Sequence, residues 1–140
     1  MKTLQPSPSY EITLPDDVVE DYDGRVSSYW RAGNTLLLQL SSTQRIQGEQ
    51  VSAADRLRDL HTRLLADWSP FNLAPESFSG DLAGSQMTDS KGQRWIDTYL
   101  VTSDLAIYAT ISGAPENFKD QSNWAMDAVR TIRIRPPVVH

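Results

Sequence analysis

Few residues of this 140-residue chain could do chemistry. It has two histidines, His61 and His140, and no cysteine. Thiolate nucleophiles, thiolate metal ligands and disulfides are therefore excluded. No P-loop, G-x-G-x-x-G, G-x-S-x-G or H-E-x-x-H motif occurs. We expect no catalytic residues and no cofactor, although a site assembled from scattered residues would leave no local signature, so an enzyme of unrecognised type stays open.

The acidic cluster at residues 16–24 is the densest run of charge in the chain. Within it, Asp21-Tyr22-Asp23-Gly24 faintly resembles a calcium loop. The spacing fails, because a glycine at loop position six would start the loop at Val19 and leave no glutamate at its end. The pattern therefore predicts a solvated acidic loop and no metal site.

His61 is the one internal histidine, and it lies near Leu57, Leu64 and Leu65. A catalytic triad or a zinc site would need partner residues that the spacing does not supply. We interpret His61 as a core or boundary residue, and a catalytic base is the alternative.

Two tight turns predict which residues share a face of the sheet. Gly33-Asn34 and Ser103-Asp104 are interpreted as two-residue loops of two hairpins. Because side chains alternate along a strand, each hairpin then has one aliphatic face. The predicted core residues are Leu36, Leu38, Leu40 and Tyr29 in the first hairpin, and Ile96, Leu100, Ile107, Ala109 and Ile111 in the second.

The opposite faces of these hairpins carry aromatic and polar residues together, a combination found at binding surfaces. The candidate binding residues for a ligand or partner are Trp30, Trp95, Asp97, Tyr99 and Tyr108. Trp95, Asp97 and Tyr99 are predicted to oppose Ser112, Thr110 and Tyr108. The alternative is that the second helix covers this face and the tyrosine hydroxyls find internal partners.

The elements that position these residues are predicted from hydrophobic period and turn signals. Strands are expected at residues 10–14, 26–32, 35–42, 81–88, 93–102, 105–112 and 131–135, and helices from Ser52 to Trp68 and at 116–130. The first helix has Ser52 as its N-cap, and Ala53, Leu57, Leu60, Leu64 and Trp68 share one side of it. The second helix turns Phe118, Ala125, Ala128 and Val129 inward. Residues 71–80 are predicted to be a connecting loop.

The predicted order, β-ββ-α-βββ-α-β, indicates the α+β class: an antiparallel sheet with two main helices packed on it. The length indicates one domain over residues 1–140, with flexible tails at 1–9 and 136–140.

Charge and hydropathy exclude two classes of partner. With 13 basic and 18 acidic residues the net charge is −5, so the surface repels nucleic acid and anionic lipid. The longest apolar-rich stretch, residues 105–111, is too short to insert into a membrane. Residues 1–10 do not read as a signal peptide, so we expect a cytoplasmic protein.

Several features along the chain form one pattern. They are the opening Ile12-Thr13-Leu14-Pro15, the mid-chain helix, the three-strand meander, and the closing Ala128-Val129 and Ile132-Arg133-Ile134. This pattern resembles the PsbP-like superfamily, which includes DcrB-like proteins. The resemblance implies an α/β/α sandwich. Members of the superfamily include photosystem II extrinsic subunits, a nuclear-transport factor and adaptors of secretion effectors, so the resemblance also implies an accessory role.

These observations together predict a non-enzymatic protein-interaction module, an accessory, adaptor or chaperone-like protein, whose partner is another protein or a second copy of the chain. A small-ligand-binding domain, with a pocket between the aromatic face and the second helix, is the alternative.

Overall fold

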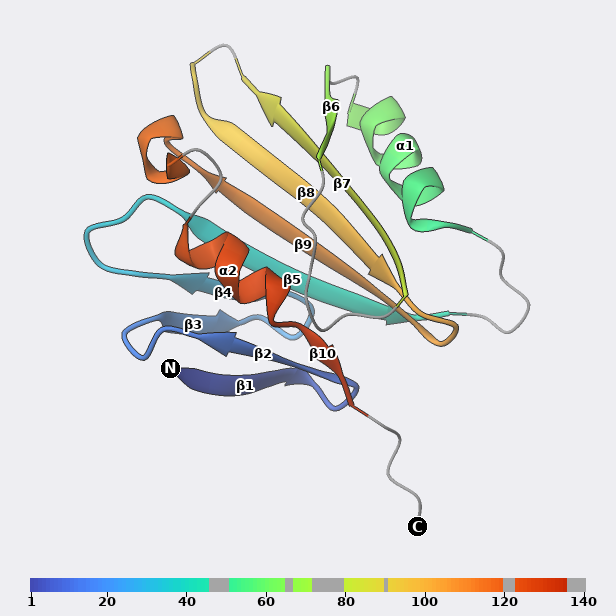
Figure 1. The fold of residues 1–140 in the computed structure, drawn as a ribbon, viewed down its shortest axis with the longest axis horizontal. Helices are drawn as coiled ribbons and strands as arrows, with labels where there is room; N and C mark the ends of the chain where they lie inside the picture. Colours follow the sequence, from blue (N-terminus) through green and yellow to red (C-terminus); the bar gives the residue numbers. More distant parts are fainter. Residues whose placement is uncertain (46–50, 65–66, 72–79, 90, 120–122, 136–140) are drawn as a thin grey trace.

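Ten strands form two antiparallel sheets in the computed structural model, which describes residues 1–45, 51–64, 67–71, 80–89, 91–119 and 123–135. The large sheet has the order β3-β4-β5-β9-β8-β7-β6, and the small sheet has the order β1-β2-β10 (Figure 1). The strands of the large sheet are β3 (Val19–Tyr22), β4 (Ser27–Trp30), β5 (Leu37–Gln44), β6 (Ser69–Phe71), β7 (Asp81–Thr88), β8 (Arg94–Val101) and β9 (Leu105–Gly113). Those of the small sheet are β1 (Lys2–Ser7), β2 (Tyr10–Leu14) and β10 (Arg133–Ile134). The α+β prediction is confirmed.

Both predicted hairpin registers are confirmed. Tyr29 pairs with Leu38 across β4 and β5, the pairing that a two-residue Gly33-Asn34 loop requires, although the strands end earlier and the loop is longer. Tyr99 pairs with Tyr108 across β8 and β9, as the Ser103-Asp104 turn requires. The division of side chains between the two faces of the large sheet therefore follows the prediction.

One face of the large sheet, the inner face, forms the main core. The predicted core residues all lie on it and are at most 2% exposed. Tyr10, Ile12 and Leu14 of the small sheet pack against them in the same buried cluster. Helix α2 (Trp124–Arg130) completes this layer, because Ala125, Ala128 and Val129 also belong to the cluster.

The other face of the large sheet, the outer face, carries helix α1 (Ala53–Leu64), which packs on β7 and β8. Ala53 joins Val101 and Ala106 in a separate small cluster. Ser52 caps the helix as predicted, since its Oγ accepts from the Asp55 backbone N–H at 3.1 Å. Among the described residues, the two helices therefore lie on opposite faces, and α1 packs on the β7–β8 part of the outer face.

The predicted helix over residues 116–130 is wrong at residues 116–119, and residues 120–122 lie outside the described ones. A 3₁₀ turn, η1 (Pro115–Asn117), is followed by Lys119 with a positive φ of 45°, which interrupts any helix. Helix α2 begins only after Asn123, whose side chain accepts from the Met126 N–H. Phe118 is nevertheless fully buried, as the prediction required.

Three short strands lie in segments that the sequence predicts to be tails or loops. Residues 2–7 pair with β2 as β1, so the predicted flexible tail at 1–9 is wrong. The acidic segment contains β3. Strand β6 comprises Ser69 and Pro70, which the sequence predicts to stop the first helix, and Phe71, the first residue of the predicted loop. Each of the three is an edge strand whose sequence has little alternation of apolar and polar residues. Its extended conformation depends on hydrogen bonds to the neighbouring strand. The predicted tail at 136–140 lies outside the described residues.

Candidate functional site

A row of largely apolar side chains crosses the outer face near one end of its strands. Registered pairs join Val19 to Trp30, Leu37 to Ser112, Ser112 to Trp95 and Trp95 to Met87. The β4–β5 register places Trp30 beside Leu37, and Trp68 directly precedes β6 at the level of Met87. We call these seven residues the tryptophan row: Val19, Trp30, Leu37, Ser112, Trp95, Met87 and Trp68. Six interstrand spacings of about 4.8 Å give the row a length of about 29 Å.

The tryptophan row is accessible to solvent. Val19 is 46% exposed, Trp30 37% and Trp68 41%, and the other four members are half-buried. These three residues are half of the six large hydrophobic residues that are exposed in the described part of the chain. Contiguous exposed apolar surface on a protein is characteristic of an interaction site.

Helix α1 positions one end of the row. The Trp68 indole stacks on the His61 imidazole, with ring centroids 4.8 Å apart and planes 12° from parallel. His61 is itself 2% exposed, and its Nε2 lies 2.6 Å from the hydroxyl of the buried Ser85. A buried histidine bonded to the sheet therefore fixes the ring plane of an exposed tryptophan.

Asp97, Tyr99 and Tyr108 lie on the same face as the row but have internal partners. The Tyr108 hydroxyl donates to Asp97 Oδ1 at 2.8 Å, and Tyr99 stacks on Tyr108 with centroids 4.8 Å apart. Asp97 is 2% exposed, and burial raises the pKa of its carboxyl group. Burial also raises the pKa values of Tyr99 and Tyr108. These three residues therefore contact one another on the outer face, and Tyr99 also packs against the cluster that contains Ala53 of α1.

Ser85, His61 and Asp97 do not have the arrangement of a hydrolytic triad. In a triad the carboxylate accepts a hydrogen bond from the histidine nitrogen that faces away from the serine. Here Asp97 is bonded to Tyr108, and neither His61 Nδ1 nor Asp97 Oδ2 has a hydrogen-bond partner within the described residues. Ser85 is also fully buried, so a substrate could not reach its hydroxyl. His61 and Ser85 instead hold the Trp68 ring in place, which agrees with the interpretation of His61 as a core residue.

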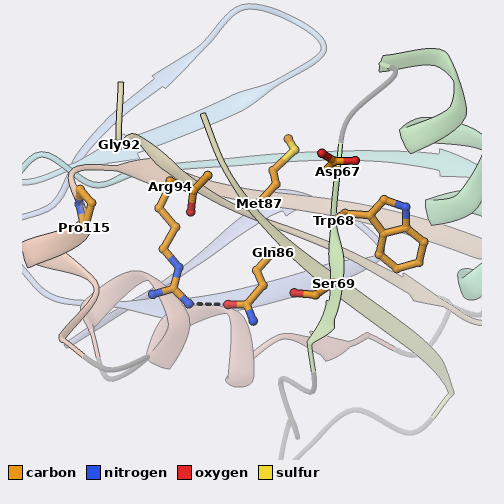
Figure 2. Close-up of a pocket in the computed structure, with 9 residues that line it drawn as sticks. Asp67, Trp68, Ser69, Gln86, Met87, Gly92, Arg94 and Pro115 are labelled. Atoms are coloured by element: carbon orange, nitrogen blue, oxygen red, sulfur yellow. Dashed lines mark hydrogen bonds between the residues drawn. The ribbon is translucent and has the colours of Figure 1, made fainter. Parts of the chain in front are cut away.

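A cavity of about 650 Å³ opens where the row meets the edge of the sheet (Figure 2). Asp67, Trp68 and Ser69 form one wall, and Met87, Gln86 and Arg94 form the other. Gln86 and Arg94 are hydrogen-bonded to each other on the inner side of β7, whereas Met87 projects to the other side (Figure 2). The Arg94 guanidinium also lies over the Phe118 ring, 5.1 Å from its centroid.

Two carboxylates of the acidic segment, those of Asp17 and Asp23, are held by hydrogen bonds. Asp17 accepts from the Arg31 guanidinium at 2.9 and 3.1 Å, which lowers the pKa of its carboxyl group. Asp23 accepts from the backbone N–H groups of Arg25 and Val26, with the same effect on its pKa. Across the described ranges, no group of three or more acidic or histidine side chains is arranged to hold a metal ion.

The structure brings Trp30 and Trp95, two of the five residues predicted from sequence, into one exposed row. It places Asp97 beneath the surface, and Tyr99 and Tyr108 in a stacked pair beside it. Sequence reasoning missed Trp68, Met87 and Val19 as members of the face. It predicts Trp68 on the buried side of the first helix, but that helix ends at Leu64. Met87 could have been identified from the sequence, because side chains alternate along the predicted strand at residues 81–88 and the predicted strand pairing places Met87 opposite Trp95.

The predicted pocket between the aromatic face and the second helix has no geometric basis, because α2 packs on the inner face. Within the described residues, no helix has the length and apolar character needed to span a membrane.

Comparison with known proteins shows the fold alone. No protein-family model and no curated protein matches the chain. The structure is similar to a crystal structure of a protein from Bacteroides thetaiotaomicron, with a TM-score of 0.61 and 15% sequence identity. The match covers 91% of this chain and 45% of that one, so this chain spans less than half the length of its structural neighbour.

Proposed function

We propose that this chain is a non-enzymatic protein-interaction module that captures a partner protein on the tryptophan row. The single observation that supports this is the partial exposure of a largely apolar row across the seven-stranded sheet, whose inner face is buried in the core. Tryptophan and methionine are enriched at protein interfaces, and tryptophan often contributes most of the binding energy.

The shape of the face favours a protein over a small molecule. The row is about 29 Å long by strand spacing, which is the scale of a helix of about 20 residues or of an extended segment. Its accessible members lie on the open face of the sheet, and the cavity beside Trp68 lies at one end of the row, where it could receive an anchoring side chain of the partner. Anchors that fill pockets are the usual energetic centres of interfaces.

The charges around the row indicate the chemistry of the partner. Asp21 lies two residues beyond Val19 on the same face, and Asp67 is adjacent to Trp68, so each end of the row carries a carboxylate. Both are exposed, and the chain has a net charge of −5. We therefore expect a partner segment with apolar anchors flanked by lysine or arginine, since complementary charge accelerates association and disfavours other partners.

The first prediction tests the row by substitution. The partner is first captured from the organism that encodes the chain, then purified and titrated by calorimetry against the wild type and against Trp30→Ala and Trp68→Ala. Each variant should bind at least tenfold more weakly, because each removes an exposed indole from the contact. Tyr22→Ala is the matched control, since Tyr22 is exposed but projects to the other side of β3.

Equal affinity of the two tryptophan variants and the wild type would overturn the proposal. Light scattering after gel filtration distinguishes the alternative occupant. If the chain forms a dimer that Trp30→Ala dissociates, the row joins two copies of the chain and the role in capturing another protein is refuted.

A further inference from the structure

A second cavity, of about 340 Å³, lies at the junction of four segments of the chain. Its described lining comes from Met1, the end of β2, the β4–β5 loop, Asn117 and Lys119, and residues 123–128. Its volume is within the range of pockets that bind small molecules. It contains no member of the tryptophan row, so a ligand bound in this cavity would be independent of the proposed function.

Hydrogen bonds to two asparagine oxygens hold the walls of this cavity in place. Asn34 Oδ1 accepts from the Leu36 N–H at 2.9 Å and from the Trp124 indole N–H at 3.4 Å. Asn117 Oδ1 accepts from the backbone N–H of Thr35 at 3.1 Å and from the hydroxyl of the same residue. Because the oxygens are occupied, the NH₂ groups of both amides are the ends left to serve a ligand, and an NH₂ group only donates.

The charged residues of the lining leave one net positive charge. Three of the lining charges are balanced. Arg31 donates through Nε and Nη2 to Asp17, Asp127 accepts from Arg130 at 3.1 Å, and the N-terminal ammonium of Met1 pairs with Asp16 at 2.9 Å. Lys119 also lines the cavity, and the described residues include no ion pair to its ammonium group. One ammonium group and two amide donors match a single carboxylate better than a doubly charged phosphate.

The backbone at Lys119 is strained in a way that sequence preference does not explain. Its φ of 45° is the one positive value at a non-glycine residue among those described. Glycine adopts this conformation without a steric penalty, whereas a lysine does not. Strained residues persist where their surroundings hold them and are concentrated at functional sites. A function for the Lys119 ammonium group in the cavity would explain why a lysine, and not a glycine, occupies this position.

We propose that this cavity binds a small organic carboxylate. The carboxylate is held by the Lys119 ammonium and the amide NH₂ groups of Asn34 and Asn117, and the carbon skeleton lies against the indole of Trp124. Trp124 is 9% exposed and contributes to the lining, so its ring offers an apolar surface at the base of the site.

The test uses nitrogen-15 NMR of the full chain with sodium benzoate and sodium succinate as probes. At least one probe should shift the Trp124 indole N–H signal and the side-chain NH₂ signals of Asn34 and Asn117 in a saturable manner. Lys119→Gln should weaken that binding at least tenfold, and Lys91→Gln, the same change at an exposed turn lysine, should leave it unchanged.

A second variant separates binding from strain. Lys119→Gly keeps the positive φ and removes the ammonium group, so it should bind neither probe while melting no lower than the wild type. The proposal is overturned if neither carboxylate gives saturable shifts, if inorganic phosphate binds and both carboxylates do not, or if either Lys119 variant binds like the wild type.

Discussion

At the residue scale, the protonation of the buried Asp97 carboxyl group on the outer face affects the free energy of unfolding. Its Oδ1 accepts from Tyr108, its Oδ2 has no partner within the described residues, and burial raises its pKa. The folded state therefore holds the proton of this group more tightly than the unfolded chain does. As the pH rises from about 3.9, the ordinary aspartate value, through the raised folded value, ionisation of Asp97 lowers the free energy of unfolding.

The second prediction concerns this group. Asp97→Asn keeps the acceptor for Tyr108 and removes the charge, so the variant should be more stable than the wild type at pH 7. The difference should disappear below about pH 3.9, where both the folded and the unfolded wild type are protonated. Urea midpoints of both proteins between pH 3.5 and 7.5 measure it. The comparison cancels the opposite trend from Asp17 and Asp23, whose pKa values are lowered. A difference independent of pH would contradict the role given to the charge.

The third prediction concerns the stacked pair that positions Trp68. His61→Phe keeps a flat ring against the indole but removes the bond to Ser85 Oγ and leaves that buried hydroxyl without its partner. A lost buried hydrogen bond costs about 1–3 kcal/mol. We expect a lower urea midpoint with the partner affinity reduced less than by Trp68→Ala. Ser85→Ala is the companion variant, and equal stability of both variants and the wild type would refute the supporting role.

At the element scale, β6 holds the end of the tryptophan row against β7. Its three residues pair with Gly84, Ser85 and Gln86. A Cβ atom at Gly84 would lie 2.7 Å from the carbonyl oxygen of Phe71, closer than real contacts allow. The absence of a side chain at Gly84 therefore permits β6 to approach β7 and places Trp68 over His61.

The fourth prediction follows from this close approach. Gly84→Ala should push β6 away from β7 and lower the free energy of unfolding by about 1–3 kcal/mol, the usual cost of overpacking. The near-ultraviolet circular dichroism of Trp68 should weaken, because its ring loses the stacked position. Thr88→Ala, at the exposed end of the same strand, is the control and should change neither quantity measurably. An unperturbed tryptophan signal in Gly84→Ala would show that β6 does not position Trp68.

At the scale of the whole molecule, the large sheet has a buried inner face and a partly exposed outer face. The inner face contacts the small sheet and α2 in one buried cluster, whereas the outer face is covered by α1 at the β7–β8 part. Hydrophobic burial stabilises a fold in proportion to the apolar area removed from water. Residues of neighbouring strands that project to opposite faces should therefore differ sharply in their contribution to stability.

The fifth prediction tests this asymmetry with one position on β5 and one on the adjacent β4. Leu38→Ala, on the inner face, should cost about 2–5 kcal/mol because it leaves a cavity in the core. Trp30→Ala, on the outer face, should cost less, about 1–2 kcal/mol, since more than a third of its surface is already in water and the site is open to solvent. Thermal and urea unfolding of the two variants measure the contrast. Comparable losses would mean that the outer face is part of the core and would also remove the basis of the proposed function.

The two hairpins, and with them the division of residues between faces, were determined by the sequence alone. The turn signals at Gly33-Asn34 and Ser103-Asp104 predict the two registers locally, and side-chain alternation then assigns each residue to a face. The first register is kept although the β4–β5 loop spans residues 31–36. Trp30 and Trp95 could therefore be placed on one face together. Short edge strands such as β1, β3 and β6 could not be predicted, because their few residues form strands only against a neighbour that is supplied by the rest of the chain.

Only the tertiary structure decided which face each helix covers. An amphipathic helix carries an apolar side but no information about which side of a sheet will receive it, since that depends on contacts between segments far apart in the chain. Here α2 packs on the inner face with β2, and α1 packs over β7 and β8. The same long-range packing buries Asp97, exposes Trp68 and assembles the Lys119 cavity from four segments.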